Sequence, residues 1–377
     1  MNNKPLMPGS MSGNESSVTK KLIRTVLFVG LIATAGISTI FLVNAQKESN
    51  VTHVVLPNLK LPDSSQSVNK VITSFQAKTD TASDNKLDSV LYNQYITHLT
   101  NGDSSGHWPV RSAYPGAGAI LPFKRVVAFY GNLYSKKMGI LGELPPKEML
   151  EKLQAEMVKW QLADTTMEVV PALHYIAITA QVTPGKAGKY RLRMPDHQVD
   201  LVMAIAKKID ALVFLDIQVG LSTLEEEIPS LEKYLLMPNV HLGIDPEFSM
   251  KTGKTPGKKV GSFDAADVNY ASNYLSDLVT KNNLPPKMLV VHRFTQGMLT
   301  NYKQINTIPR VQVVIDMDGW GTQALKINAY KQFLYKEPVQ FTGFKLFYKN
   351  DTKANGNLLT PTQLLKLKPQ PVYIQYQ

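Results

Sequence analysis

Eight short runs of β-branched and aromatic residues, separated by segments of helical period, constrain the fold of this chain more than any other feature. Between the runs, apolar residues recur every three or four positions, as one buried face of a helix requires. Several runs, such as 311–316, are apolar on both faces, which is typical of strands covered by helices. The runs occupy 125–130, 167–175, 211–217, 240–245, 287–292, 311–316, 341–347 and 372–376.

Eight strands alternating with helices over about 255 residues predict a TIM-like (β/α)8 barrel, which we assign to residues 121–377. The chain ends on the eighth run, so no helix follows it. We expect the segment 88–99, DSVLYNQYITHL, to form a short helix that fills this gap. An open doubly wound sheet is the alternative, although no glycine-rich phosphate-binding turn follows the first run.

A long apolar segment, 22–43, precedes these features. It contains nineteen consecutive uncharged residues, close to the ~20 needed to cross the hydrocarbon layer of a membrane. Lys20, Lys21 and Arg24 stand at its start, so the positive-inside rule places residues 1–21 in the cytoplasm and the barrel outside the cell. We therefore predict a single-pass signal anchor. A cleaved signal peptide and a buried core helix are the alternatives.

Composition limits what the protein binds. From 44 to 120 the chain is largely polar and lacks a sustained period, which predicts an extracytoplasmic linker with the one short helix. There is no cysteine, which excludes disulfides, thiol nucleophiles and thiolate metal sites. The net charge of +11 favours anionic partners such as membrane headgroups or envelope polymers. No zinc-finger spacing or basic helix indicates nucleic acid.

Polar residues follow the predicted strands at the end where barrel enzymes carry their active sites. We therefore expect a functional site at this mouth of the barrel. In chain order the polar set is His174, Asp216, Gln218, Asp245, Glu247, His292, Arg293, Asp316, Asp318, Lys345, Tyr348 and Gln375.

The sharpest feature of this set is Asp245-Pro246-Glu247, at the end of the fourth run. Two carboxylates at i and i+2 on a strand point to the same side, roughly 7 Å apart. Hydrolysis of a glycosidic bond requires such a pair, one acid with a raised pKa and one charged partner. We predict Glu247 as the proton donor and Asp245 as its partner. The alternative is a turn after Pro246, capped by Asp245, with Glu247 in solvent.

Other strand ends add candidates. We name Asp316 and His292 as further catalytic residues, His292 as a general base or as a group that orients a carboxylate. Asp216 and Arg293 are expected to pair and to bind substrate, and Trp320 to stack on a sugar ring. The alternatives are a backbone-bonded core histidine, a structural ion pair and ordinary packing of the tryptophan.

Two basic, glycine-containing loops are predicted to border the same mouth, 181–193 and 249–262. They suggest a cationic rim for an anionic polymer, and solvated loops are the alternative. Their basic residues are Lys186, Lys189, Arg191, Arg193, Lys251, Lys254, Lys258 and Lys259. Among these, Arg191, Lys254 and Lys258 are the substrate-binding candidates.

Six segments carry a resemblance to a family of exported bacterial proteins, chiefly actinobacterial, over about 123–377. They are GILGELPP (139–146), LDIQVG (215–220), HLGIDPEF (241–248), VGSFDAADVN (260–269), LVVHRF (289–294) and GFKLFYKNDT (343–352). This resemblance implies the fold and export but no catalytic residue.

The chain is more loosely similar to glycoside hydrolase barrels of the lysozyme and chitinase type. Those enzymes carry D-x-E acids at the end of the fourth strand, where Asp245 and Glu247 stand here. The longer chitinase signature D-x-x-D-x-D-x-E is absent, and proline at the middle position is unusual. The similarity therefore implies a fold and a position for the acids.

Together these features predict a membrane-anchored, extracytoplasmic glycoside hydrolase that acts on peptidoglycan or another cell-wall glycan without metal or cofactor. A barrel that binds wall glycan without turnover is one alternative. A metal-dependent hydrolase is another, with ligands drawn from His174, Asp216, Asp245, His292 and Asp316.

Overall fold

The computed structural model describes residues 87–353 and 356–377. The predicted cytoplasmic tail, the membrane segment 22–43 and the linker as far as residue 86 lie outside the described residues. Within the described ranges, no helix combines the length and the apolar character needed to cross a membrane.

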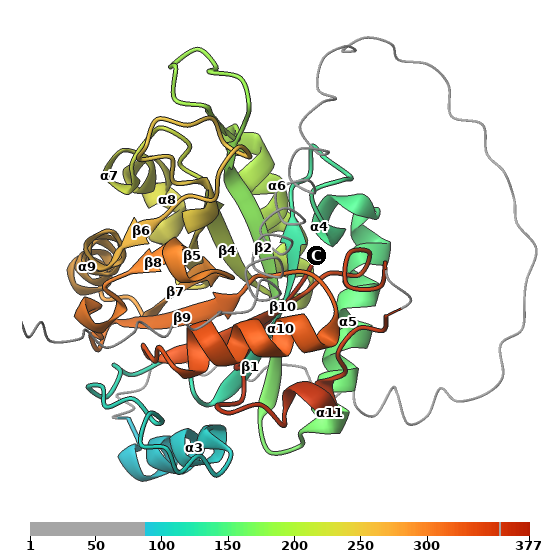
Figure 1. The fold of residues 1–377 in the computed structure, drawn as a ribbon, viewed down its shortest axis with the longest axis vertical. Helices are drawn as coiled ribbons and strands as arrows, with labels where there is room; N and C mark the ends of the chain where they lie inside the picture. The colour runs from blue at the N-terminus through green and yellow to red at the C-terminus, as the bar shows by residue number, and fades with distance from the viewer. Residues whose placement is uncertain (1–86, 354–355) are drawn as a thin grey trace, which may run out of the picture. The chain divides into compact units, whose positions relative to one another are not determined.

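Eight parallel strands form a closed barrel (Figure 1). Each strand pairs with the next in chain order, and β1 closes the ring by pairing with both β2 and β11. The predicted (β/α)8 barrel is confirmed, because an open sheet would leave β1 and β11 as unpaired edges. The strands are β1 (Lys124–Gly131), β2 (Glu168–Ala180), β4 (Leu212–Ile217), β5 (Val240–Ile244), β7 (Lys287–Arg293), β9 (Val311–Met317), β10 (Phe341–Leu346) and β11 (Tyr373–Tyr376).

Helices surround the ring where the periodic stripes predict them. Two of the stripes form the buried faces of α6 (Asp196–Ala206) and α9 (Ala265–Asn282). A third is broken at Pro229, which lacks a backbone N–H, into α7 (Leu224–Glu227), one 3₁₀ turn and α8 (Glu232–Leu235). The other elements are α4 (Ile140–Glu143), α5 (Pro146–Ala163), β3 (Arg191–Arg193), β6 (Phe263–Asp264), β8 (Leu299–Thr300), α10 (Gln323–Tyr330) and α11 (Pro361–Leu364).

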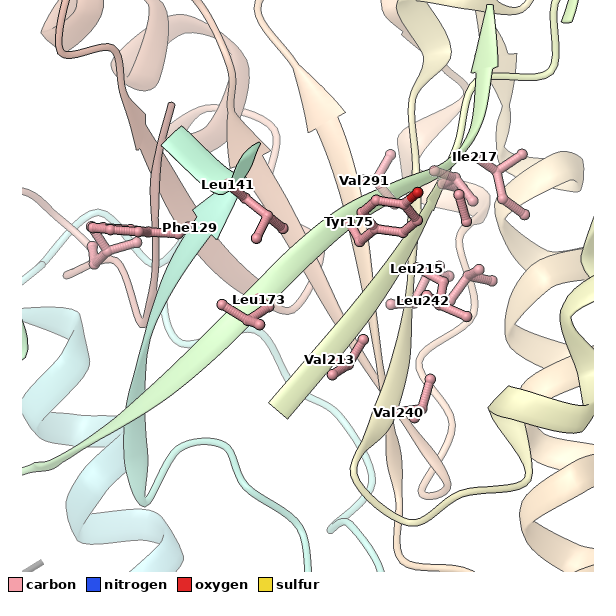
Figure 2. Packing of buried hydrophobic residues seen from close by; sticks show 14 of the residues in the cluster. Phe129, Leu141, Leu173, Tyr175, Val213, Leu215, Ile217, Val240, Leu242 and Val291 are labelled. Carbon is pink, nitrogen blue, oxygen red and sulfur yellow. The ribbon is translucent and has the colours of Figure 1, made fainter. Parts of the chain in front are cut away.

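Alternation along the strands divides the apolar core into two layers. Outward side chains such as Leu173, Val213 and Leu242 pack beneath the helices, and Figure 2 shows part of this layer. Inward side chains such as Phe214 and Val290 fill the interior of the barrel toward the amino-terminal ends of the strands. Toward the carboxyl ends the inward positions become polar, and the candidate site lies there.

The helix expected at 88–99 is present as α3 (Ser89–Thr100), with the Asp88 side chain accepting from two amides of its first turn. Its expected position is wrong. Leu99 joins the cluster inside the barrel, and its carbonyl accepts from the Gln370 amide. Because that cluster fills the amino-terminal end of the barrel, α3 covers this end and not the outside of β11.

On the outside of the ring, the last residue of β11 contacts α5 instead. The buried Trp160 of α5 donates through its ring nitrogen to the Tyr376 hydroxyl, at 3.0 Å. The helix α5, which packs on β1 and β2, therefore also reaches the last strand of the ring.

Candidate active site

Four of the predicted polar residues meet inside the barrel at the carboxyl ends of their strands. His174 comes from β2, Asp216 from β4, His292 from β7 and Asp316 from β9, and all four side chains are completely buried. Register brings them together, since His292 stands directly beside Asp316 in the paired strands. Inward positions at one level of a closed barrel face one another across its axis.

Asp216 lies at the centre of this cluster. Its Oδ1 is 3.4 Å from His174 Nε2 and 3.4 Å from His292 Nε2, and its Oδ2 accepts a 2.9 Å hydrogen bond from the Tyr130 hydroxyl. Burial alone would raise the pKa of Asp216, but His292 and His174 outweigh it and hold the pKa below its usual value. Asp216 is therefore ionised at neutral pH.

The predicted pairing of Asp216 with Arg293 is wrong. Arg293 follows the inward-facing His292 on β7, so its side chain leaves the strand on the opposite face. There it pairs with Glu337 and donates to the Phe333 carbonyl at 2.9 Å. Arg293 supports the outer layer and does not reach the site.

Tyr348 also lies outside the barrel, although it belonged to the predicted polar set. Its ring stacks on Tyr376 with centroids 5.3 Å apart, and its hydroxyl donates to Glu156 of α5 at 3.0 Å. These contacts place it in the layer between the strands and α5.

Asp318 continues the inward line of Asp316 just beyond the end of β9. Its Oδ1 is 2.9 Å from the Lys345 ammonium, and its Oδ2 is 3.2 Å from His292 Nδ1. Burial alone would raise the pKa of Asp318, but the attraction of Lys345 and His292 outweighs it and lowers the pKa. The Lys345 ammonium also lies 3.7 Å from the centre of the Tyr130 ring, a cation–π contact.

The Asp245-Pro246-Glu247 segment forms a corner and does not continue the strand. β5 ends at Ile244, and Pro246–Phe248 make a 3₁₀ turn. Asp245 caps this turn, its Oδ1 accepting from the Glu247 amide at 3.0 Å, while its Oδ2 is 3.4 Å from the Gln218 side-chain amide. The expectation that both acids lie on one strand is therefore wrong. The alternative is correct in the turn capped by Asp245 but not in placing Glu247 in solvent, since Glu247 is only partly exposed.

Both acids of this corner nevertheless interact with the central cluster. Burial raises the pKa of Asp245 to about 7; the positive charge of His292 lowers it, while repulsion from Asp216 and Asp318 adds to the rise. Burial, together with repulsion from Asp245 and Asp318, raises the pKa of Glu247 well above its usual range. Asp245 is 2% exposed, whereas Glu247 is partly exposed. Glu247 is thus a partly exposed carboxyl whose protonated form is favoured by its surroundings.

The pKa values of the two histidines are shifted in opposite directions in the metal-free protein. Burial lowers the pKa of His174 to about 4, so its ring is neutral at pH 7. Burial also acts to lower the pKa of His292, but the nearby Asp216 and Asp318 reverse this effect and raise the pKa well above 6.5. Burial raises the pKa of Asp316 to about 7, opposed by His292 and reinforced by Asp318.

Glycine at position 243 permits the central contacts to form. A Cβ there would lie 2.4 Å from His174 Nε2 and 2.6 Å from Asp216 Oδ1. Any side chain would push one of these groups away. In Gly243-Ile244-Asp245, the glycine thus leaves space for the contact between His174 and Asp216, and Asp245 follows at the carboxyl end of β5.

The predicted substrate-binding residues lie around the mouth with different partners. Lys254 and Lys258 are exposed in the loop after β5, and Trp320 is partly exposed, with the Lys353 ammonium 5.9 Å from its ring. Arg191 is bound by Glu226 and by the buried Glu227, at 3.1 and 2.6 Å.

The two basic loops are connected through the segment that follows β4. The Leu221 amide donates to the Lys189 carbonyl, and the Met250 amide donates to the Gly220 carbonyl. The two loops are therefore linked through this segment, and the acids that bind Arg191 neutralise part of their charge. The cationic rim itself stays a prediction.

Two tyrosines that sequence reasoning did not single out complete the cluster. Tyr130 is the second-last residue of β1, and its hydroxyl donates to Asp216. The hydroxyl of Tyr373 in β11 lies 2.5 Å from His174 Nδ1. The strand phase could have identified Tyr130, which is the last inward residue of the first predicted run. Tyr373 stands at the beginning of β11, where sequence alone gave no reason to expect a contact with a strand end.

No family model matches this chain, and no curated protein is similar to it. Among solved structures, that of ZgEngAGH5_4 in complex with a cellotriose is similar over 59% of this chain and 79% of its own length. The sequence identity is 14% and the TM-score is 0.32. The barrel assignment therefore rests on its strand pairing, and the resemblance to exported bacterial proteins remains a prediction.

Proposed function

We propose that this protein is a glycoside hydrolase that cleaves its substrate by acid/base catalysis at the Asp245–Glu247 corner. The observation that carries the proposal is the difference between the two acids. Glu247 is partly exposed, while Asp245 is buried, fixed by the Glu247 amide and close to Gln218. Glycosidic hydrolysis uses two carboxyl groups that play such different parts.

In this mechanism Glu247 donates its proton to the glycosidic oxygen as the bond from that oxygen to the anomeric carbon breaks. The ionised Asp245 stabilises the positive charge that develops on the sugar. A water molecule then bonds to the anomeric carbon and gives one proton to the Glu247 carboxylate, which restores the acid. Because the two carboxyls are neighbours, repulsion disfavours ionisation of both. The pair therefore holds one proton over a range of pH near and above neutrality, as acid/base work requires.

The remaining charged groups fix this arrangement. Lys345 neutralises Asp318 at 2.9 Å, which keeps a second buried carboxylate from raising the pKa of Asp245 further. Tyr130 joins the two halves of the cluster, because it binds Asp216 and lies under the Lys345 ammonium. These residues are positioning residues and do not react with the substrate.

The proposed substrate is peptidoglycan or another glycan of the cell envelope. Support comes from the apolar segment 22–43 with basic residues before it, which we interpret as a membrane anchor with the barrel outside. The net charge of +11 and the exposed Lys254 and Lys258 at the mouth suit an anionic polymer.

The test is hydrolysis of purified peptidoglycan and of chitin- and cellulose-type oligosaccharides by the full-length protein, measured as release of new reducing ends. Replacing Glu247 by Gln keeps the size of the side chain and removes the proton. The rate should fall by about 100- to 10,000-fold, the usual contribution of a general acid.

Glu168→Gln provides the matched control, since Glu168 is exposed at the amino-terminal start of β2 and pairs with the exposed Lys124. It should leave the rate unchanged. Equal rates for Glu247→Gln and the native protein would refute the assignment. Glycan binding that survives this substitution, with no turnover by the native protein, would identify a binding barrel instead.

A further inference from the structure

Three buried polar atoms at the centre of the barrel point at one another without a hydrogen bond. They are His174 Nε2, Asp216 Oδ1 and His292 Nε2, and each is enclosed by protein and has no hydrogen-bond partner. Leaving a buried polar atom unpaired costs about 1–3 kcal/mol. Three such atoms at one point indicate a ligand that all of them bind.

The spacing of the three atoms fits a metal ion. All of them lie within 4.8 Å of one another, and the two contacts to Asp216 Oδ1 are each 3.4 Å. An ion with bonds of about 2.1 Å in tetrahedral geometry holds its ligand atoms about 3.4 Å apart, and Zn²⁺ has such bonds to imidazole nitrogen and carboxylate oxygen. An octahedral ion with the same bond length would need about 3.0 Å.

The outer contacts of the two histidines leave the inner nitrogens available as ligands. His174 Nδ1 lies 2.5 Å from the Tyr373 hydroxyl and 3.0 Å from the Gln375 side-chain amide. The hydroxyl oxygen can accept the Nδ1 proton, and so can the amide if it is flipped to present its oxygen. His292 Nδ1 lies 3.2 Å from Asp318 Oδ2, close enough for an ion pair although the two atoms are not aligned for a hydrogen bond. Histidines that bind metals usually donate their second N–H to such groups.

Asp216 is oriented in the same way. Its Oδ2 is occupied by the Tyr130 hydroxyl at 2.9 Å, which leaves Oδ1 directed at the two histidines. Gly243 leaves the contact point open, since a Cβ there would clash with both His174 Nε2 and Asp216 Oδ1.

We propose that His174, Asp216 and His292 bind one divalent ion of the Zn²⁺ type inside the barrel, below the Asp245–Glu247 corner. Two imidazoles and one carboxylate give three protein ligands, and a water molecule or a substrate group takes the fourth position. Asp245 and Asp316 are not part of this ligand set, so it is smaller than the five-residue set considered from the sequence.

The site can be tested with Zn²⁺ and Co²⁺ alone. Full-length, tag-free protein is stripped with a chelator, dialysed and titrated, and bound metal is measured by calorimetry and by elemental analysis. We expect one Zn²⁺ per chain, and a visible Co²⁺ spectrum of tetrahedral intensity. X-ray absorption at the zinc edge should show two imidazoles and oxygen at about 2.0–2.1 Å.

Substitutions locate the ion. Asp216→Asn and His292→Asn should weaken Zn²⁺ binding by more than about 100-fold, and Asp318→Asn, which removes only an outer contact, by about 10- to 100-fold. His197→Asn is the control, because His197 is an exposed histidine that is not among the proposed ligands, and its Nε2 lies 3.2 Å from the Tyr134 hydroxyl. It should bind like the native protein.

The proposal is overturned if the native protein retains no stoichiometric Zn²⁺, or if folded Asp216→Asn protein binds it as tightly as the native chain. A Co²⁺ spectrum of octahedral intensity, or an absorption edge without imidazole, would overturn it equally. The last two measurements use the native protein and stand even if a variant fails to fold.

Metal binding and glycan hydrolysis can fail separately. Glu247→Gln should lose hydrolysis and keep Zn²⁺ binding. A native protein that binds Zn²⁺ but cleaves no glycan would refute the proposed function and leave the metal site intact.

Discussion

Wall-glycan hydrolysis should decline on the acid side of neutrality if Asp245 is the ionised partner of Glu247. Because Asp245 is buried and close to two other carboxylates, its pKa is about 7, and the carboxyl is half ionised at that pH. At pH 5 only about 1% of it is ionised, so kcat/KM should be about 50-fold lower than at pH 7. The same calculation for an ordinary aspartate gives almost no change over this range.

At high pH the rate should fall because a proton is lost, whereas at low pH it falls because one is gained. Glu247 must keep its proton to act as the acid, and burial with repulsion from Asp245 and Asp318 raises its pKa well above the usual range. The rate should therefore fall on the alkaline side once Glu247 ionises, at a higher pH than an ordinary glutamate would. In the pH–rate profile, Asp245→Asn should abolish the decrease at low pH, and Glu247→Gln should abolish the decrease at high pH.

The assay is release of reducing ends from soluble wall-glycan fragments between pH 4 and 9, at substrate concentrations far below KM. It uses chelator-treated protein, because a divalent ion bound by His174, Asp216 and His292 would itself lower the pKa of Asp245. Circular dichroism at each pH ensures that a lower rate is not caused by unfolding. A rate at pH 5 equal to that at pH 7 would refute the role of Asp245. Because Lys345 and His292 hold the pKa of Asp318 low, that result would favour Asp318 as the ionised carboxylate.

Further predictions concern the barrel itself. Arg125→Met leaves Asp164 without the guanidinium that lies 2.8 Å away in a buried setting, so the free energy of unfolding in urea at pH 7 should fall by about 3–5 kcal/mol. A change below 1 kcal/mol would show that the pair is not needed. Gly243→Ala places a methyl group 2.4 Å from His174 Nε2, and thermal unfolding should occur at a lower temperature, whereas an unchanged Tm would contradict the close contact. Leu153→Ala empties a fully buried site beneath α5 and should cost about 2–5 kcal/mol in the same urea assay.

Much of the architecture follows from local pattern. The eight runs identify all eight strands of the ring, because a strand covered by helices must be apolar on both faces. The stripes of α6 and α9 follow from the period of a helix with one buried face, and the break at Pro229 follows from its missing N–H. The position of α3 does not follow, since its apolar residues suit either end or the outer wall of a barrel.

For the candidate site, the sequence predicts which side chains point into the barrel, because inward and outward positions alternate along each strand. Inward-facing positions near the carboxyl ends of four strands are occupied by His174, Asp216, His292 and Asp316. A closed parallel barrel brings such positions together. The same alternation places Arg293 outside, because it is the neighbour of His292, and the pairing with Asp216 could have been rejected on that ground. The strand expected to continue through Glu247 ends at Ile244. Pro246 has no backbone N–H to donate to a neighbouring strand, and a turn follows instead.

The amino-acid sequence by itself determined the strands, the helical faces and the end of the barrel at which polar residues collect, since these depend on periodicities of two and 3.6 residues along the chain. Only the tertiary structure decided which polar groups touch. Distances such as 3.4 Å from Asp216 to both histidines depend on closure of the ring, on strand register and on the space left at Gly243. The pKa values of Asp245 and Glu247 depend on burial and on charges contributed by other strands, and no local pattern encodes them.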